Sequence, residues 1–61
     1  MRKFAEWIKL GVRATRFGQA CTIIEIMPDS SGMCDVMVRY DIAHERLGTD
    51  FATAQTDLRP A

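Results

Sequence analysis

The segment 34–41 constrains the fold of this chain most strongly, because apolar and polar residues alternate along it. Val36, Val38 and Tyr40 share one face of an extended strand, and the residues between them share the other face. The preceding segment 20–27 is rich in β-branched residues, and the sequence 28–32 between the two has the composition of a turn. Two strands joined by a short turn that contains glycine predict a β-hairpin. The chain is therefore predicted to be mainly β.

The remaining segments predict shorter elements around this hairpin. The sequence 12–17 alternates loosely up to Gly18, and 49–54 has the pattern of a short strand. The segment 42–48 is compatible with a helical turn or a loop, and 55–58 with one tight helical turn. Because no repeat or linker interrupts the 61 residues, we expect a single domain over 1–61.

The N-terminal residues 1–10 have the spacing of a short amphipathic helix. Phe4, Trp7 and Ile8 recur at three- and four-residue intervals, and Gly11 follows as a stop signal. A helix this short does not persist alone in water, so its apolar stripe must pack against something. We expect it to cover Ile23 and Met37, two apolar residues predicted on the outer face of the sheet, either within one chain or across a homodimer.

Size and composition exclude several functional classes. A chain of 61 residues has too small a core to enclose a substrate pocket, so the protein is not expected to be an enzyme unless several copies share a site. Cys21, Cys34 and His44 are too few for a typical zinc site, and no cofactor is predicted. No apolar run has the length of a membrane span, and charged residues interrupt the N-terminal stretch that a signal peptide would need. We expect a cytoplasmic protein.

The order of these elements resembles small SH3-like β-barrels of the KOW, Tudor-like and CarD-like kinds. The residues that carry the resemblance are 16–20 leading into 22–26, then 36–41 and the terminal segment 56–60. The resemblance implies a barrel of four to five antiparallel strands over 12–60, preceded by the helix 1–10. In such barrels a glycine begins the long second strand, and a tight turn carrying a buried leucine lies beside the last strand. SH3-like barrels host many unrelated functions, so the resemblance does not by itself select one.

The charges divide the chain into a basic and an acidic part although the net charge is zero. Residues 1–18 carry about +4 and residues 19–61 about −4, by counting the side chains. KOW-type nucleic-acid binders are usually basic, whereas this barrel segment is acidic. The sequence therefore favours a non-enzymatic protein-interaction module, such as a small regulator or inhibitor of the kind that mobile elements carry. Its partner is expected to contact the charged loop 41–50 and the sheet near Arg39.

The alternative function is nucleic-acid binding through the basic N-terminal segment. Basic side chains can bind phosphates while exposed aromatic rings beside them stack on bases. Phe17 directly follows Arg16 and gives this combination. An uncovered sheet edge would also allow a peptide or a second copy of the chain to add as a strand. The candidate binding residues for the two functions together are Arg2, Lys3, Lys9, Arg13, Arg16, Phe17 and Arg39.

Overall fold

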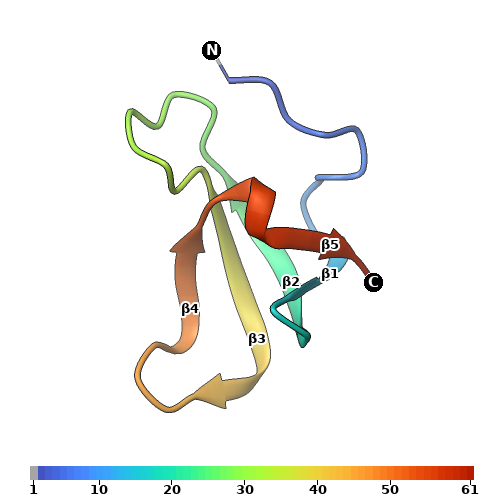
Figure 1. The fold of residues 1–61 in the computed structure, drawn as a ribbon, viewed down its shortest axis with the longest axis vertical. Helices are drawn as coiled ribbons and strands as arrows, with labels where there is room; N and C mark the ends of the chain where they lie inside the picture. Colours follow the sequence, from blue (N-terminus) through green and yellow to red (C-terminus); the bar gives the residue numbers. More distant parts are fainter. Residues whose placement is uncertain (1) are drawn as a thin grey trace.

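A computed structural model describes residues 2–61 and contains one antiparallel sheet of five strands (Figure 1). The strands are β1 (Arg13–Arg16), β2 (Gln19–Ile26), β3 (Val36–His44), β4 (Gly48–Thr53) and β5 (Leu58–Pro60), with a 3₁₀ turn η1 (Gln55–Asp57) before β5. Their order across the sheet is β4-β3-β2-β1-β5. The predicted β class is confirmed. The sheet does not close into the expected barrel, because β4 and β5 remain its two edges and are joined only through η1.

Strands β1 and β2 are joined by the two-residue turn Phe17–Gly18. Both residues have a positive φ, 50° and 82° respectively, and the Arg16↔Gln19 pair closes the turn. Left-handed conformations at both central positions give a turn whose twist matches that of the flanking strands. Gly18 adopts this conformation without cost, whereas Phe17 is held there by the hairpin.

The predicted hairpin of β2 and β3 is confirmed, although its connection is longer than the expected turn. Ile26 pairs with Val36, so residues 27–35 connect the strands. The Met27 N–H donates to the Asp35 carbonyl (2.9 Å), which closes this connection. The Asp35 N–H donates to the Thr53 carbonyl (3.2 Å), and its buried side chain accepts hydrogen bonds from Gln55.

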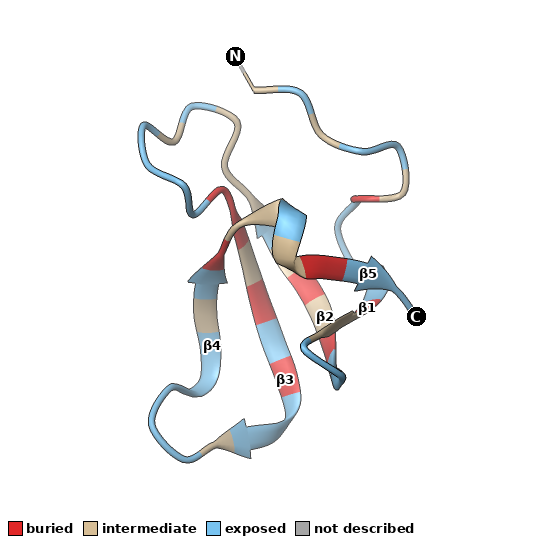
Figure 2. Cartoon of the chain, viewed as in Figure 1, coloured by how far each residue is buried: buried red, intermediate tan, exposed pale blue. Residues whose placement is uncertain are grey.

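The core lies on the face of β3 that the alternation predicts, since Val36, Val38 and Tyr40 are all buried (Figure 2). The placement of Ile23 on the outer face is wrong. Ile23 is fully buried and pairs with Val38 in the sheet. The β2–β3 register shifts between Ile23 and Glu25, so simple alternation does not hold along β2.

The predicted N-terminal helix is absent. Residues 2–12 form an irregular segment whose backbone bonds to the sheet instead: the Gly11 N–H donates to the Ile23 carbonyl (2.8 Å) and the Ile23 N–H to the Val12 carbonyl (3.0 Å). So short a helix has little intrinsic stability, and bonds to the sheet replace its own. Ile8 is nevertheless 5% exposed and lies in the same core cluster as Ile23, and Trp7 packs against that cluster within one chain. The predicted cover of Met37 on the outer face stays a prediction.

In the C-terminal part, the structure confirms the predicted tight turn at 55–58 and corrects the prediction for 42–48. The tight turn is found as η1, and the next residue, Leu58, is buried. The segment 42–48 is neither a helical turn nor wholly a loop, because β3 continues to His44 and β4 begins at Gly48. Only residues 45–47 form the turn between them, which gives a long, exposed β3–β4 arm (Figure 1).

Candidate protein-interaction groove

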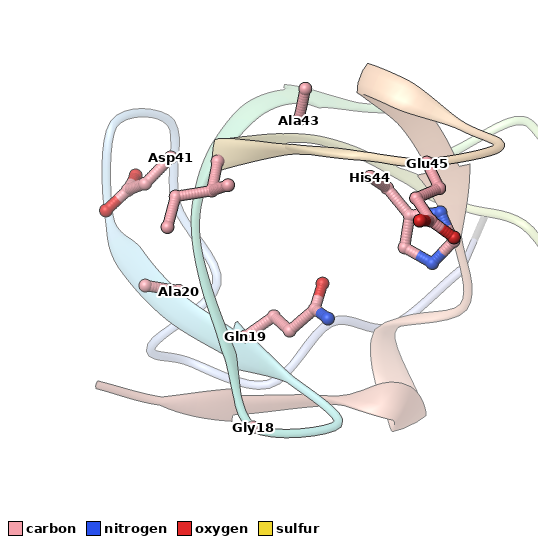
Figure 3. Close-up of a pocket in the computed structure, with 8 residues that line it drawn as sticks. Gly18, Gln19, Ala20, Asp41, Ala43, His44 and Glu45 are labelled. Atoms are coloured by element: carbon pink, nitrogen blue, oxygen red, sulfur yellow. The ribbon is translucent and has the colours of Figure 1, made fainter.

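A groove of about 590 Å³ opens between the start of β2 and the end of β3 (Figure 3). Gln19 and Ala20 of β2 form one wall together with Gly18. The opposite wall is residues 41–45. The Gln19 side chain points into the opening toward His44, whereas the Asp41 carboxylate points away from it (Figure 3). The volume lies in the range of ligand sites in proteins.

The groove exists because two strands that pair along most of their length separate at this end. The last β2–β3 pair is Cys21↔Tyr40, although β3 runs on to His44. On the other side of β3, the register passes from Arg39↔Asp50 to His44↔Gly48, so residues 40–43 face only Thr49. Residues 41–43 are therefore extended and exposed, with no register partner in β2 or β4.

Polar groups at one end of the groove come from the β3–β4 turn. The backbone N–H groups of Arg46 and Leu47 lie 3.1 and 3.4 Å from His44 Nδ1, which accepts from them and thereby holds the turn. The His44 ring also stacks on Tyr40 at a centroid distance of 6.0 Å. Glu45 is exposed beside it and makes no ion pair within residues 2–61. Glu45 is thus a carboxylate in the groove lining that forms no ion pair with a described residue.

Apolar side chains lie exposed at the same end of the molecule. Ile42 lines the groove and is 84% exposed, and Phe17, which precedes the wall residue Gly18, is 74% exposed. Leu47 in the β3–β4 turn is also exposed. Large apolar side chains grouped around a concave site are typical of a surface that binds another molecule.

Arg13, a predicted binding residue, is engaged within the sheet. Its Nη1 donates to Asp41 Oδ1 (2.6 Å) and to Thr22 Oγ1 (2.7 Å), and its Nη2 donates to Asp41 Oδ2. The hydrogen bonds donated by Arg13 lower the pKa of Asp41 below its ordinary value, and the same bonds raise the pKa of Arg13. Arg13 therefore fixes the wall of the groove at Asp41.

Arg39 forms the second bidentate pair on the sheet surface. Its Nε and Nη2 donate to the two carboxylate oxygens of Asp50, at 2.8 and 2.9 Å. Hydrogen bonding to Arg39 lowers the pKa of the Asp50 carboxyl. The charge of Arg39 is compensated at the predicted contact surface.

Arg16 and Phe17 lie together, as their adjacency suggests. The Arg16 guanidinium is 4.7 Å from the centroid of Phe17 and 4.5 Å from that of Phe51, which are cation–π distances. Arg16 also donates to Thr53 Oγ1 (2.8 Å) and to the Tyr40 hydroxyl (3.0 Å). It joins β1 to β3 and β4, and it makes no ion pair within the described residues.

The remaining predicted cations lie away from the groove. Arg2 donates to the Ser30 carbonyl (2.9 Å) and forms an ion pair with Asp35 (3.6 Å), in the connection at the opposite end of β2. Lys3 and Lys9 are exposed in the N-terminal segment. The structure thus separates Arg2, Lys3 and Lys9 of the N-terminal segment from Arg13, Arg16, Phe17 and Arg39 of the sheet, and it does not gather the predicted binding residues into one site.

Sequence reasoning missed the buried pair of Asp35 and Gln55. Asp35 is 2% exposed. Its carboxylate accepts hydrogen bonds from the Gln55 backbone N–H (2.8 Å) and from the Gln55 side-chain amide (3.1 Å). The Gln55 side chain also donates to the Lys3 carbonyl and accepts from the Ala5 N–H, which ties the N-terminal segment to η1. The only sequence signal is that Asp35 lies just after the predicted turn, and Asp is common in turns.

The cysteines are both free: Cys21 is buried and Cys34 exposed. Burial raises the pKa of the Cys21 thiol. No group of three potential metal ligands is found within residues 2–61. Over the same range, no helix has the length and apolar character needed to cross a membrane.

No protein-family model, curated protein or solved structure matches this chain.

Proposed function

We propose that this chain is a non-enzymatic, SH3-like protein-interaction module that binds a partner in the groove between β2 and β3. The observation that carries the proposal is the concave site walled by two strand ends that have no pairing partner on the groove side. Exposed Ile42 and Phe17 supply apolar contacts around it. Such a module suits a small regulator or inhibitor that acts by occupying a site on another protein.

The distribution of charge supports a protein partner more than a nucleic acid. Arg2, Arg13 and Arg39 each form an ion pair with an aspartate. An arginine binds phosphate through its N–H donors and its positive charge. In these three arginines an aspartate already pairs with the donors and neutralises the charge. Glu45, by contrast, leaves a negative charge at the groove that would repel a polyanion.

Site-specific photocrosslinking tests the proposal. A benzophenone amino acid replaces Ile42 in one variant and Leu10, which is 66% exposed in the N-terminal segment, in the matched control. After irradiation in nuclease-treated lysate, we expect a protein adduct from position 42 and none of the same mass from position 10. An adduct with a second copy of the chain would identify a homodimer. No adduct at position 42 contradicts a partner in the groove.

Nucleic-acid binding remains the second candidate because of Arg16 and Phe17. Arg16 is a cation without a carboxylate partner in the described chain, and it lies beside an exposed aromatic ring. Lys3 and Lys9 add charge without any ion pair in that range. If this candidate is right, a fluorescent oligothymidine at low salt binds the wild-type chain, and Phe17→Ala and Lys9→Ala both weaken binding. We expect no binding.

A further inference from the structure

We propose that the occupant of the groove is an extended segment of a partner protein that adds as a strand beside residues 41–43 and places a lysine or arginine at Glu45. This inference rests on the proposed function and gives its partner a chemistry. It joins the unpaired part of β3 with the uncompensated carboxylate at the end of the same wall.

The backbone of residues 41–43 has the conformation that strand addition requires. These residues belong to β3, so they are already extended, yet the β2 register ends at Tyr40 and the β4 register passes over them. An extended strand with open N–H and C=O groups binds another strand through its main chain. Because β3 is held by β2 and β4 up to Arg39, the open part is ordered in advance, which reduces the entropy lost on binding.

The start of β2 does not pair with this part of β3. Gln19 and Ala20 would be the next β2 residues to pair with β3, but they lie on the opposite wall of the groove. Gln19 directs its amide into the space between the walls (Figure 3). An added strand would lie beside β3 and find this amide as a further donor and acceptor.

The side chains of the groove select an apolar and basic segment. Ile42 and the alanines at 20 and 43 offer apolar contacts, so alternate residues of the added strand should be apolar. Asp41 also borders the groove, but Arg13 compensates its charge. Glu45 is the charged group left to recognise a ligand, and no Lys or Arg lines the groove to oppose a cation.

Backbone methylation of a model peptide tests strand addition without altering the protein. The probe is a capped peptide of alternating lysine and valine, titrated into the ¹⁵N-labelled chain and followed by amide chemical shifts. We expect the largest shifts at Gln19, Ala20 and residues 41–43. Only one of the two alternate sets of N–H groups in an added strand faces β3, so the same peptide is made with N-methyl groups on either set, and one of these two forms should bind roughly tenfold or more weakly. Equal affinity of the unmethylated peptide and both methylated forms overturns strand addition.

Charge variants test whether the added strand places a lysine or arginine at Glu45. Glu45→Gln should weaken the lysine–valine peptide about two- to five-fold at low salt, as expected for an exposed ion pair. The matched control is Glu25→Gln, an exposed glutamate on β2 outside the groove, which should leave the affinity unchanged. A glutamate–valine peptide that binds as well as the lysine–valine peptide overturns the choice of a basic ligand.

The two tests separate this inference from the function on which it rests. If neither peptide shifts residues 41–43 while crosslinking at position 42 still captures a protein, the partner does not add as a strand and the inference is wrong, although the interaction module stands. If crosslinking at position 42 also fails, both are wrong.

Discussion

The Arg13 guanidinium and the Asp41 carboxylate form a bidentate pair that joins β1 to β3 across the surface of β2. Thr22 on the intervening strand accepts a hydrogen bond from the same guanidinium. Asp41 is the first residue of β3 beyond its last β2 partner, so the pair holds the strand at the point where the groove opens. The geometry of the groove therefore depends on an exposed ion pair and not only on the core.

The Arg13–Asp41 pair should make the free energy of unfolding depend on pH in the acid range. Hydrogen bonding to Arg13 holds the pKa of folded Asp41 below its ordinary value of 3.8, which the unfolded chain is expected to show. The pair therefore contributes stability above about pH 3.8, and the contribution is lost as the pH falls through the lower pKa of the folded state. We expect Asp41→Asn to reduce the urea midpoint at pH 7 and to lessen its decline in acid.

An exposed aspartate without an ion pair gives the control for this experiment. Asp29 lies in the β2–β3 connection and pairs with no cation in the described chain. Asp29→Asn should therefore retain the wild-type acid profile. If Asp41→Asn loses stability in acid as steeply as the wild type, the pair does not contribute to the folded state in solution.

Arg16 should stabilise the open sheet by joining its separated strands. The guanidinium lies over Phe51 and donates to Tyr40 and Thr53, so it connects β1 to strands that β1 does not pair with. Arg16→Ala should lower the free energy of unfolding by about 1–3 kcal/mol, as expected for a cation–π contact and hydrogen bonds of a charged group. Arg16→Lys should not restore it, because an ammonium cannot lie flat on the ring and donate to both hydroxyls.

Urea unfolding of both variants measures this effect, with Arg46→Ala as the control. Arg46 is exposed in the β3–β4 turn and its side chain has no ion pair within residues 2–61, so its truncation should change stability by less than about 0.5 kcal/mol. Full stability of Arg16→Lys would show that the planar contacts of Arg16 are not needed.

Glycine replacements test the turn that bounds the groove. Gly18 has φ +82°, a conformation that side chains disfavour, but a Cβ there would meet no atom within 4 Å. Gly18→Ala should therefore destabilise the chain by about 1–2 kcal/mol through the backbone alone. Gly32 has an equally open surrounding without a left-handed φ, so Gly32→Ala should be neutral or slightly stabilising. Similar thermal midpoints for the two variants would contradict the turn conformation.

The predicted parts of the fold are those that local patterns determine. Alternation along Val36–Tyr40 requires a strand with one buried face, and the structure has it. The spacing of Phe4, Trp7 and Ile8 correctly indicates apolar side chains that pack on the core, but it wrongly predicts a helix. Whether so short a segment becomes helical depends on backbone partners in β2, which are distant in sequence and have no local signal.

The groove could not be predicted for a related reason. It depends on where β2 and β3 stop pairing and on the irregular register between β3 and β4. The alternating pattern does extend through Asp41, but nothing in it reveals that the pairing of β3 with β2 stops at the Cys21↔Tyr40 pair. Likewise, Arg13 and Arg39 were identified as binding cations because sequence alone could not show that Asp41 and Asp50 lie opposite them.

The Asp35–Gln55 pair should control the attachment of the N-terminal segment. Gln55 binds Asp35 with its backbone N–H and its side-chain amide, and the same amide bonds the backbone at Lys3 and Ala5. Gln55→Ala removes only the side-chain bonds, so we expect a loss of about 1–2 kcal/mol together with a red shift of Trp7 emission as residues 3–7 loosen.

Asp35→Ala should have the larger effect, because it removes the acceptor of both the Gln55 N–H and the Gln55 amide, and it also removes the ion pair with Arg2. A loss of about 2–3 kcal/mol is expected, because the Gln55 N–H is left without its acceptor. Thr56→Ala, an exposed residue of η1 whose side chain makes none of these bonds, serves as the control and should keep both the wild-type stability and the wild-type emission. If Gln55→Ala leaves the tryptophan spectrum unchanged, the N-terminal segment is held by the packing of Ile8 and Trp7 alone, and the hydrogen bonds through Gln55 do not determine its position.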